Sequence, residues 1–313
     1  MRLYTPSNLP DATPPTTSET AAAPAGPSNL RQRVIYGLIG AAMLLGSVWF
    51  SPWTFGLFFA FVQTVMLWEF YRMMRADGYA PATWIGVGAS IILFGIVYWV
   101  CFKGAYPDVD YIFGTIVLFA FFLLACLIVV LVLREISIWP NHKHPFINIS
   151  TTVVGILYVS LPMSLLIIIS HIVRIHNESG YDYRRIFALL FLVWASDIGA
   201  YAAGKTFGKH KMAPKISPGK TWEGWAGGFL LTLIVGWALG YLLPDRSLTH
   251  RLVAAGVVAV FAPLGDLAES MLKRSVGVKD SGRIMPGHGG LLDRFDAFLL
   301  VLPVLALLQL LFN

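Results

Sequence analysis

The sequence predicts an all-α integral membrane protein with about nine transmembrane helices. Hydrophobic residues make up 57% of the 313 residues, and charged residues only 13%. The mean hydropathy is +0.68, far above the range of soluble proteins. Apolar runs of about 18 or more residues recur along the chain, and each is long enough to cross a bilayer as a helix.

These runs divide the chain into a tail and two membrane regions. Residues 1–30 are rich in Pro, Ser, Thr and Ala and have no apolar core, so we expect a disordered tail and not a signal peptide. Residues 31–185 form an N-terminal transmembrane region of about five spans, and residues 186–313 a C-terminal transmembrane region that holds the candidate catalytic residues. The predicted spans are Val34–Phe50, Trp53–Met73, Trp84–Phe102, Tyr111–Leu133, Ile149–Val173, Ile186–Ala203, Trp225–Leu243, Leu252–Leu264 and Ala297–Phe312. The eighth is short, and Gly265–Glu269 is a candidate continuation of it.

Basic residues in the loops predict the orientation of these spans. Arg31 and Arg33 precede the first span and place the N-terminus in the cytoplasm by the positive-inside rule. The two loops richest in charge then also face the cytoplasm, and the C-terminus lies outside. The segment Arg174–Arg185 breaks the rule, because it carries three arginines on the outer side.

Composition excludes several other classes of protein. The net charge of +6 fits basic cytoplasmic loops and an anionic substrate. Nucleic acid is a poor candidate partner, because the basic residues lie between spans and not on a soluble module. Cys101 and Cys126 lie in or beside apolar runs and indicate neither a disulfide framework nor a zinc site.

A polar run from Ser270 to Asp296 is the strongest functional signal in the chain. Charged groups close to a bilayer are costly and are usually functional. The ionisable residues of the run are Lys273, Arg274, Lys279, Asp280, Arg283, His288, Asp293, Arg294 and Asp296. Cations mixed with carboxylates suit a phosphate substrate that carries a divalent metal ion.

Carboxylates at both ends of this run are candidate metal ligands. Asp293 and Asp296 are three residues apart at the start of the last apolar segment, a spacing that puts both on one face of a helix. Asp266, at the exit of the preceding span, completes a set of three oxygen donors for Mg²⁺ if the loop folds back. Glu269 is a weaker candidate. The alternative is that these acids cap helices or pair with nearby arginines.

The remainder of the run supplies groups for a phosphate. We expect Lys273, Arg274, Lys279, Arg283 and Arg294 to offset the charge of a triphosphate, although single members also suit anionic lipid. The Gly287–Gly290 turn can expose backbone N–H groups to phosphate. His288 within this turn is a candidate for phosphate contact, for proton transfer or for helix capping.

A second polar segment, Ser196–Gly224, is predicted to cradle nucleotide phosphates. Asp197 falls inside an apolar helix, where an isolated carboxylate is costly, so we expect it to face a polar cavity. The phosphate-binding candidates are Lys205, Lys209, Ser217 and Lys220. Gly199–Thr206 reads G-A-Y-A-A-G-K-T and matches the Walker A pattern, but an apolar helix precedes it where a P-loop needs a strand.

One acid in the N-terminal region is also notable. Glu69 lies near the end of the second predicted span and is either a buried acid or a partner of Arg72 at i,i+3. We expect the pair with Arg72.

The two polar segments together resemble the phosphatidate cytidylyltransferase family, also called CDP-diglyceride synthases. The family signature runs S-x-hydrophobic-K-R, four residues, K-D, a spacer, P-x-H-G-G and D-R-hydrophobic-D. Its fixed positions are matched by Ser270, Lys273, Arg274, Lys279, Asp280, Pro286, His288, Gly289, Gly290, Asp293, Arg294 and Asp296. Met285 replaces the usual Leu, Ile or Phe. The Ser196–Gly224 segment is also similar to the family, and the match covers about the last 120 residues.

The resemblance implies a reaction and its components. Members convert CTP and phosphatidate to CDP-diacylglycerol and pyrophosphate, with Mg²⁺ as cofactor and room for a second metal ion. It implies a bacterial cytoplasmic (inner) membrane protein, a homodimer and an active site that faces the cytoplasm. Asp266, Asp293 and Asp296 would then hold metal, with Lys273 and His288 in catalysis.

Two alternatives stay open at this stage. A related membrane enzyme that phosphorylates an isoprenoid alcohol with CTP would keep the basic loops but lack the full Ser270–Asp296 signature. A transporter would place its charged groups near the middle of the bilayer, in broken helices.

Overall fold

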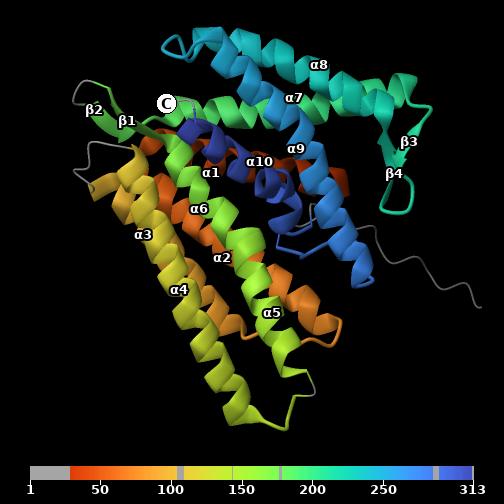
Figure 1. Cartoon of the computed structure of the whole chain (residues 1–313). Helices are drawn as coiled ribbons and strands as arrows, with labels where there is room; N and C mark the ends of the chain where they lie inside the picture. Colours follow the sequence, from red (N-terminus) through yellow and green to blue (C-terminus); the bar gives the residue numbers. More distant parts are fainter. Residues whose placement is uncertain (1–28, 104–108, 143, 176–177, 285–288, 312–313) are drawn as a thin grey trace, which may run out of the picture.

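The computed structural model describes residues 29–103, 109–142, 144–175, 178–284 and 289–311. The described chain is almost entirely helical, with two short antiparallel hairpins (Figure 1). The helices are α1 (Asn29–Phe50), α2 (Pro52–Ala76), α3 (Thr83–Lys103), α4 (Val109–Ile138), α5 (Pro145–Gly155), α6 (Leu161–Ser170), α7 (Tyr183–Phe207), α8 (Trp222–Ala238), α9 (Leu248–Ser275) and α10 (Leu292–Leu311), with one π-helical turn η1 (Ile156–Ser160) and one 3₁₀ turn η2 (Leu239–Tyr241). The hairpins pair β1 (His171–Ile175) with β2 (Glu178–Tyr181), and β3 (Lys211–Ala213) with β4 (Ser217–Thr221).

The predicted multi-span helical architecture is confirmed. Seven helical stretches in the described part of the chain are long and apolar enough to cross a membrane. Val34–Phe50 is a shorter apolar helix, and α10 begins with charged residues and lies outside this set. The number nine and the orientation stay predictions. The expected tail falls almost wholly on residues 1–28, which lie outside the described residues.

Two helix ends differ from the predicted span boundaries. The candidate continuation of the eighth span is confirmed, because α9 continues past Leu264 through Gly265–Glu269 and ends only at Ser275. Part of the polar run is therefore helix and not loop, and it includes Lys273 and Arg274. The fifth span ends at Ser170, where the backbone of His171 becomes extended and starts β1.

Helix starts follow from local capping chemistry. Ser51 caps α2 in a reciprocal capping box with Thr54, and Pro52 occupies the first turn, where its missing N–H costs nothing. Asp182 caps α7, and Thr221 caps α8 by accepting a hydrogen bond from the Gly224 N–H at 3.1 Å. These caps fix where the polar segments give way to helix.

Helices α7 and α8 lie side by side, and α9 crosses beside them (Figure 1). Small residues form the α7–α8 contact: a Cβ added to Gly199 would lie 2.7 Å from the Gly227 carbonyl oxygen, and one added to Gly228 would lie 2.6 Å from that of Ser196. Small residues at such contacts let membrane helices approach closely. The β3–β4 hairpin follows α7 directly and lies at the C-terminal end of this helix (Figure 1).

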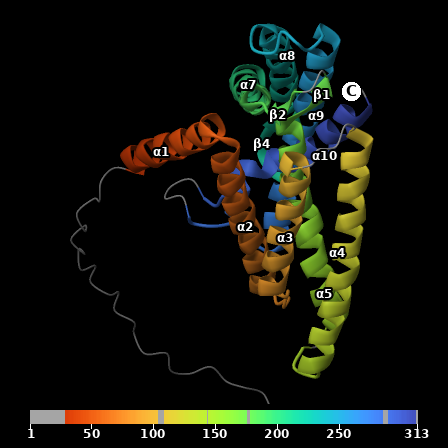
Figure 2. The same ribbon diagram turned by 90° about the vertical axis from the view of Figure 1, so that its left-hand side faces the viewer.

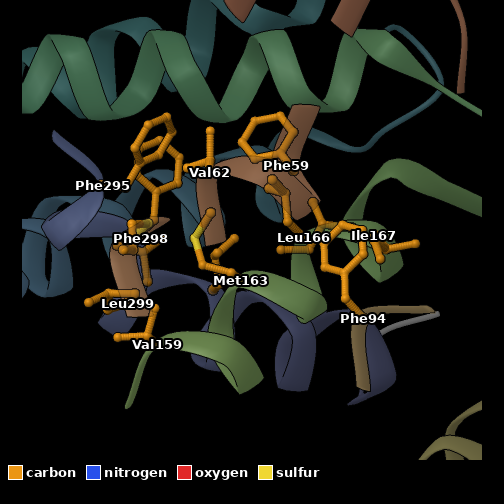
Figure 3. Close-up of a cluster of buried hydrophobic side chains, with 14 of the residues drawn as sticks. Phe59, Val62, Phe94, Val159, Met163, Leu166, Ile167, Phe295, Phe298 and Leu299 are labelled. Carbon is orange, nitrogen blue, oxygen red and sulfur yellow. The ribbon is translucent and has the colours of Figure 1, made fainter. Parts of the chain in front are cut away.

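The core joins α10 to helices from the first half of the chain. Phe295, Phe298 and Leu299 of α10 lie among Phe59 and Val62 of α2 and the side chains of α6 (Figure 3). The rings of Phe59 and Phe295 meet edge to face at 6.0 Å. Figure 2 shows α1 turning sharply away from α2, while α2 to α5 extend together. This core holds the first turns of α10 against α2.

Candidate active site

Two groups of acidic residues line the contact between α9 and α10, one helical turn apart, and we call them the first and second acidic steps. The helices run antiparallel, so Asp266 lies next to Asp296, and Glu269 with Lys273 lies next to Asp293 one turn away. The contact is close at Gly265, where an added Cβ would lie 2.6 Å from the Asp296 carbonyl oxygen. Close packing of the two helices therefore sets the spacing between the acids.

The first step gathers three carboxylates around one lysine. The Lys220 ammonium lies 2.7 Å from Asp266 Oδ2 and donates a hydrogen bond to the Pro263 carbonyl at 2.9 Å. Asp296 interacts electrostatically with Asp266, Asp197 and Lys220. One lysine cannot neutralise three ionised carboxylates, so a cation bound here would offset the excess negative charge of their ionised forms.

A cavity of about 510 Å³ opens beside this step, between α7, the β3–β4 hairpin, α8 and α9. Its size is in the range of small-molecule sites. The polar and aromatic groups in its wall are Ser196, Asp197, Tyr201, Lys205, Ser217, Lys220, Thr221, Trp225 and Asp266. Asp197, expected to face a polar cavity, lines this one together with Lys205, Ser217 and Lys220, and the binding roles of these residues stay predictions.

The second step is a buried ion-pair network. Lys273 contacts both Glu269 and Asp293, with 2.7 Å between its ammonium and Asp293 Oδ1. Asp293 also accepts hydrogen bonds from the Gly290 N–H at 2.7 Å and from the Ser281 hydroxyl at 3.0 Å. The Lys273 ammonium and the Gly290 N–H thus offset the cost of burying the Asp293 carboxylate.

Glu69 extends this network into the first half of the chain. Its side chain is fully buried, and its carboxylate accepts a hydrogen bond from the Leu292 N–H at 2.9 Å. It also lies 3.3 Å from the Ser281 hydroxyl, whose single proton is shared between Glu69 and Asp293. Gly282 and Gly290 pack so closely on the carboxylate that a Cβ at either position would overlap it. The expected pair with Arg72 is wrong, because Arg72 lies over the Trp68 ring 5.5 Å from its centre.

Several predicted phosphate ligands lie away from the cavity wall. Lys209 is exposed, and its backbone N–H donates to Glu223 at 3.1 Å. Arg274 is exposed and donates to the Val278 carbonyl at 3.1 Å, which closes the end of α9. Lys279 and Arg283 are exposed on the segment that joins α9 to α10. The site roles of these four residues stay predictions.

Two further expectations concern residues around the start of α10. Arg294 is exposed beside an apolar groove formed with Ile284, Leu291 and Phe295. His288 lies outside the described residues, so its role stays a prediction.

The Walker-like stretch is not a phosphate loop. Gly199–Thr206 lies wholly inside α7, with helix on both sides of the glycines. Its backbone N–H groups are used within the helix and cannot cradle a phosphate.

Sequence reasoning missed Ser281, and it assigned Glu69 the wrong partner. Tyr158 was also missed. Its hydroxyl is buried on the π-helical turn η1 and has no hydrogen-bond partner among the described residues, and it interacts electrostatically with Glu269 and Asp296. A serine and a tyrosine carry no distinctive spacing, so only the fold brings them to the acids.

The metal assignment is supported only in part by the geometry. Among the described residues, no three His, Cys, Asp or Glu side chains stand close enough to hold a metal ion as they are placed. Asp266 and Asp296 lie together with excess negative charge and offer the hard oxygen donors that Mg²⁺ takes. Asp293 instead contacts Lys273, so its place in the same metal site stays a prediction.

Comparison with known proteins identifies the family. The model of the cytidylyltransferase family matches residues 31–312. The chain belongs to the cytidylyltransferase family. The matched residues therefore include both acidic steps and the cavity. They also include the N-terminal helices, which the sequence motifs do not cover.

Curated relatives in this family cover nearly the whole chain. It is similar to the phosphatidate cytidylyltransferase of Haemophilus influenzae, with 31% identity over 290 residues that cover 88% of this chain and 96% of the relative. The phosphatidate cytidylyltransferase of Bacillus subtilis is 32% identical over 291 residues, covering 91% and 99%. That of Staphylococcus aureus strain COL is 51% identical over 133 residues, covering 42% and 50%.

Proposed function

We propose that this cytidylyltransferase transfers the cytidylyl group of CTP to phosphatidate and releases pyrophosphate. The single observation that carries the proposal is the pairing of the Ser270–Asp296 signature with a cavity of nucleotide size. The lysine-lined wall of that cavity meets the carboxylates of the first acidic step. Relatives named for this reaction, similar over nearly the full chain, support it.

The nucleotide occupies the cavity between α7, α8 and α9. Lys205 and Lys220 face the triphosphate, and the hydroxyls of Ser217 and Thr221 donate hydrogen bonds to it. Tyr201 and Trp225 offer aromatic surface to the base in the same cavity.

The lipid approaches from the apolar groove beside Arg294. This groove has a volume of about 380 Å³ and lies between α1, α2, α7 and α10. Its apolar wall, with Phe58, Phe61 and Trp194, suits acyl chains, while Arg294 faces the phosphate of the headgroup.

In the reaction, an oxygen of the phosphatidate phosphate attacks the α-phosphorus of CTP. The bond from this phosphorus to the oxygen that bridges to the β-phosphate breaks, and pyrophosphate leaves. Lys220 and Lys205 reduce the repulsion between the two anions and stabilise the charge that develops on pyrophosphate. Lys273 holds Asp293 and Glu269 in place one turn away.

Mg²⁺ is the proposed cofactor, with a second metal ion allowed. Asp266 and Asp296 would hold it, with Asp197 nearby and Asp293 as the further predicted ligand. When bound, the metal would neutralise phosphate oxygens of the attacking and leaving groups.

The proposal includes the placement of the protein in the cell. Helices α1 and α10, added to the seven candidate spans, give the predicted nine. An odd number of spans with a cytoplasmic N-terminus leaves the C-terminus outside. We place the protein in the bacterial inner membrane as a homodimer, with the acidic steps on the cytoplasmic side, where CTP is found.

The test uses purified full-length protein in detergent with phosphatidate, labelled CTP and Mg²⁺. We expect a labelled CDP-lipid that disappears with EDTA. An isoprenoid alcohol replaces phosphatidate in a parallel reaction. Product from the alcohol alone would favour the kinase alternative, and no product from either lipid in folded protein would overturn the proposal.

A further inference from the structure

A cluster of arginines lies at the end of the helix bundle away from the acidic steps. Arg185 at the start of α7 and Arg246, His250 and Arg251 at the start of α9 line a cavity of about 100 Å³. Arg251 and Asp266 are separated by 15 residues of α9, a rise of about 22 Å along a helix. The cluster is therefore separate from the proposed catalytic centre, at the end where Arg174–Arg185 breaks the positive-inside rule.

Among the described residues, the arginines of this cluster outnumber its carboxylates. Arg184 pairs with Asp182 at 2.9 Å and with Asp245 at 3.8 Å. Asp182 also lies 3.8 Å from Arg185, and Asp245 lies 3.9 Å from Arg246. The two aspartates thus serve Arg184, Arg185 and Arg246, and no aspartate or glutamate is paired with Arg251 among the described residues.

Two of these arginines carry buried N–H groups that make no hydrogen bond with the described residues. Arg185 is only 8% exposed and donates to the His171 carbonyl, while its Nε lies 3.8 Å from Asp182 without a hydrogen bond. The Nε and Nη1 atoms of Arg251 are also buried and have no hydrogen-bond partner among the described residues. Its guanidinium packs against Gly240, where a Cβ would overlap it. Buried donors of charged groups are expensive to leave unpaired, so an acceptor that reached the Arg251 guanidinium from the cavity would lower this cost.

The helix ends around the cavity favour an anion. Both α7 and α9 begin here, and their capping residues Asp182 and Ser247 satisfy only part of the first turns. Cations beside two helix N-termini oppose the helix dipoles. An anion placed between them would relieve this conflict and satisfy the arginine donors.

We propose that this arginine cluster binds a phosphate group, carried by an anionic phospholipid of the surrounding membrane. A volume of about 100 Å³ equals that of about three water molecules, which suits a phosphate but not a nucleotide. The remainder of the wall is apolar, with Leu189, Leu239, Leu243 and Leu305, and suits the glycerol end of a lipid. Planar arginine forks match phosphate oxygens in pairs.

The test measures the melting temperature of full-length protein in detergent with added lipid. The probes are phosphatidylglycerol, phosphatidylcholine and inorganic phosphate, compared in wild type, Arg251→Gln and the control Arg75→Gln. Arg75 is exposed at the other end of the bundle. We expect phosphatidylglycerol to stabilise wild type and Arg75→Gln, and its apparent affinity to fall about tenfold or more in Arg251→Gln. Phosphatidylcholine should act weakly, because its choline cation offsets the phosphate.

The three probes show whether the phosphate comes from a lipid or from solution, and the variants show whether the arginine cluster binds it at all. Stabilisation by inorganic phosphate that depends on Arg251 would support the site with free phosphate as its ligand. Equal stabilisation of wild type and Arg251→Gln, or none in wild type, would overturn it. If Arg251→Gln does not fold, Arg251→Lys keeps the charge but loses the fork, and its affinity must still fall several-fold. Unchanged affinity in that variant would also overturn the proposal.

Discussion

The contact between α9 and α10 at Gly265 provides the sharpest test of how the acids are positioned. In Gly265→Ala the new Cβ would lie 2.6 Å from the Asp296 carbonyl oxygen and 2.9 Å from Ala297 Cα. Both neighbours are backbone atoms, so the helices must separate by about 0.8 Å to restore the 3.4 Å of an ordinary contact. Such overpacking costs about 1–3 kcal/mol.

The same shift moves Asp266 away from Asp296, and misplacement by about 1 Å can cost about a hundredfold in rate. We expect kcat/KM for CDP-lipid formation to fall between ten- and a hundredfold, and the melting temperature to fall with it. Gly256→Ala is the matched control, because it lies on α9 and a Cβ there meets nothing within 4 Å. It should be neutral or stabilising by up to about 1 kcal/mol. Normal activity and melting temperature in Gly265→Ala would refute the reasoning.

Three further substitutions test the buried network and the helix packing around it. Lys273→Met leaves Glu269 and Asp293 without their cation and should destabilise the protein by about 3–5 kcal/mol; an unchanged melting temperature would contradict this. Glu69→Gln weakens the charge-assisted bonds from Leu292 and Ser281, which are worth about 1.5–3 kcal/mol each. Activity should therefore fall about tenfold or more. Full activity would exclude a role for Glu69. Tyr71→Phe removes only a 2.7 Å bond to the Thr152 carbonyl and should cost about 1 kcal/mol without changing KM for CTP; a raised KM would place Tyr71 in the site.

Much of the fold could be predicted from apolar run length alone. Runs long enough to cross a bilayer must be helical, since lipid offers no partner to an open backbone. The end of α9 could not be predicted this way, because Ser270–Ser275 is polar yet helical. Its helical state depends on contacts such as Lys273 with Asp293, which hydropathy does not detect.

The candidate site was predictable where spacing carries the chemistry. Asp197, Lys205, Ser217 and Lys220 of the Ser196–Gly224 segment line one cavity together with Asp266. The division of the acids into two steps was not predictable. The spacing of Asp293 and Asp296 predicts that they share a helical face. It does not predict which residue of α9 each of them contacts.

The contacts of Glu69 show why the other part of the site cannot be predicted without the three-dimensional fold. Its local sequence places Arg72 one turn away, and an exposed helix would favour that pair. Packing of α10 on α2 instead brings the Leu292 N–H to the carboxylate, more than 200 positions along the chain. A single sequence without relatives contains no signal for such a contact.

We propose that Asp266 and Asp296 act together in cytidylyl transfer to phosphatidate. The initial rate of CDP-lipid formation by the full-length protein and by Asp296→Asn, with Asp77→Asn as control, tests this role. Asp77 is exposed at the end of α2. We expect a loss of about a hundredfold or more in Asp296→Asn with an unchanged fold, and a normal rate in Asp77→Asn. A folded Asp296→Asn protein with the wild-type rate would rule the role out.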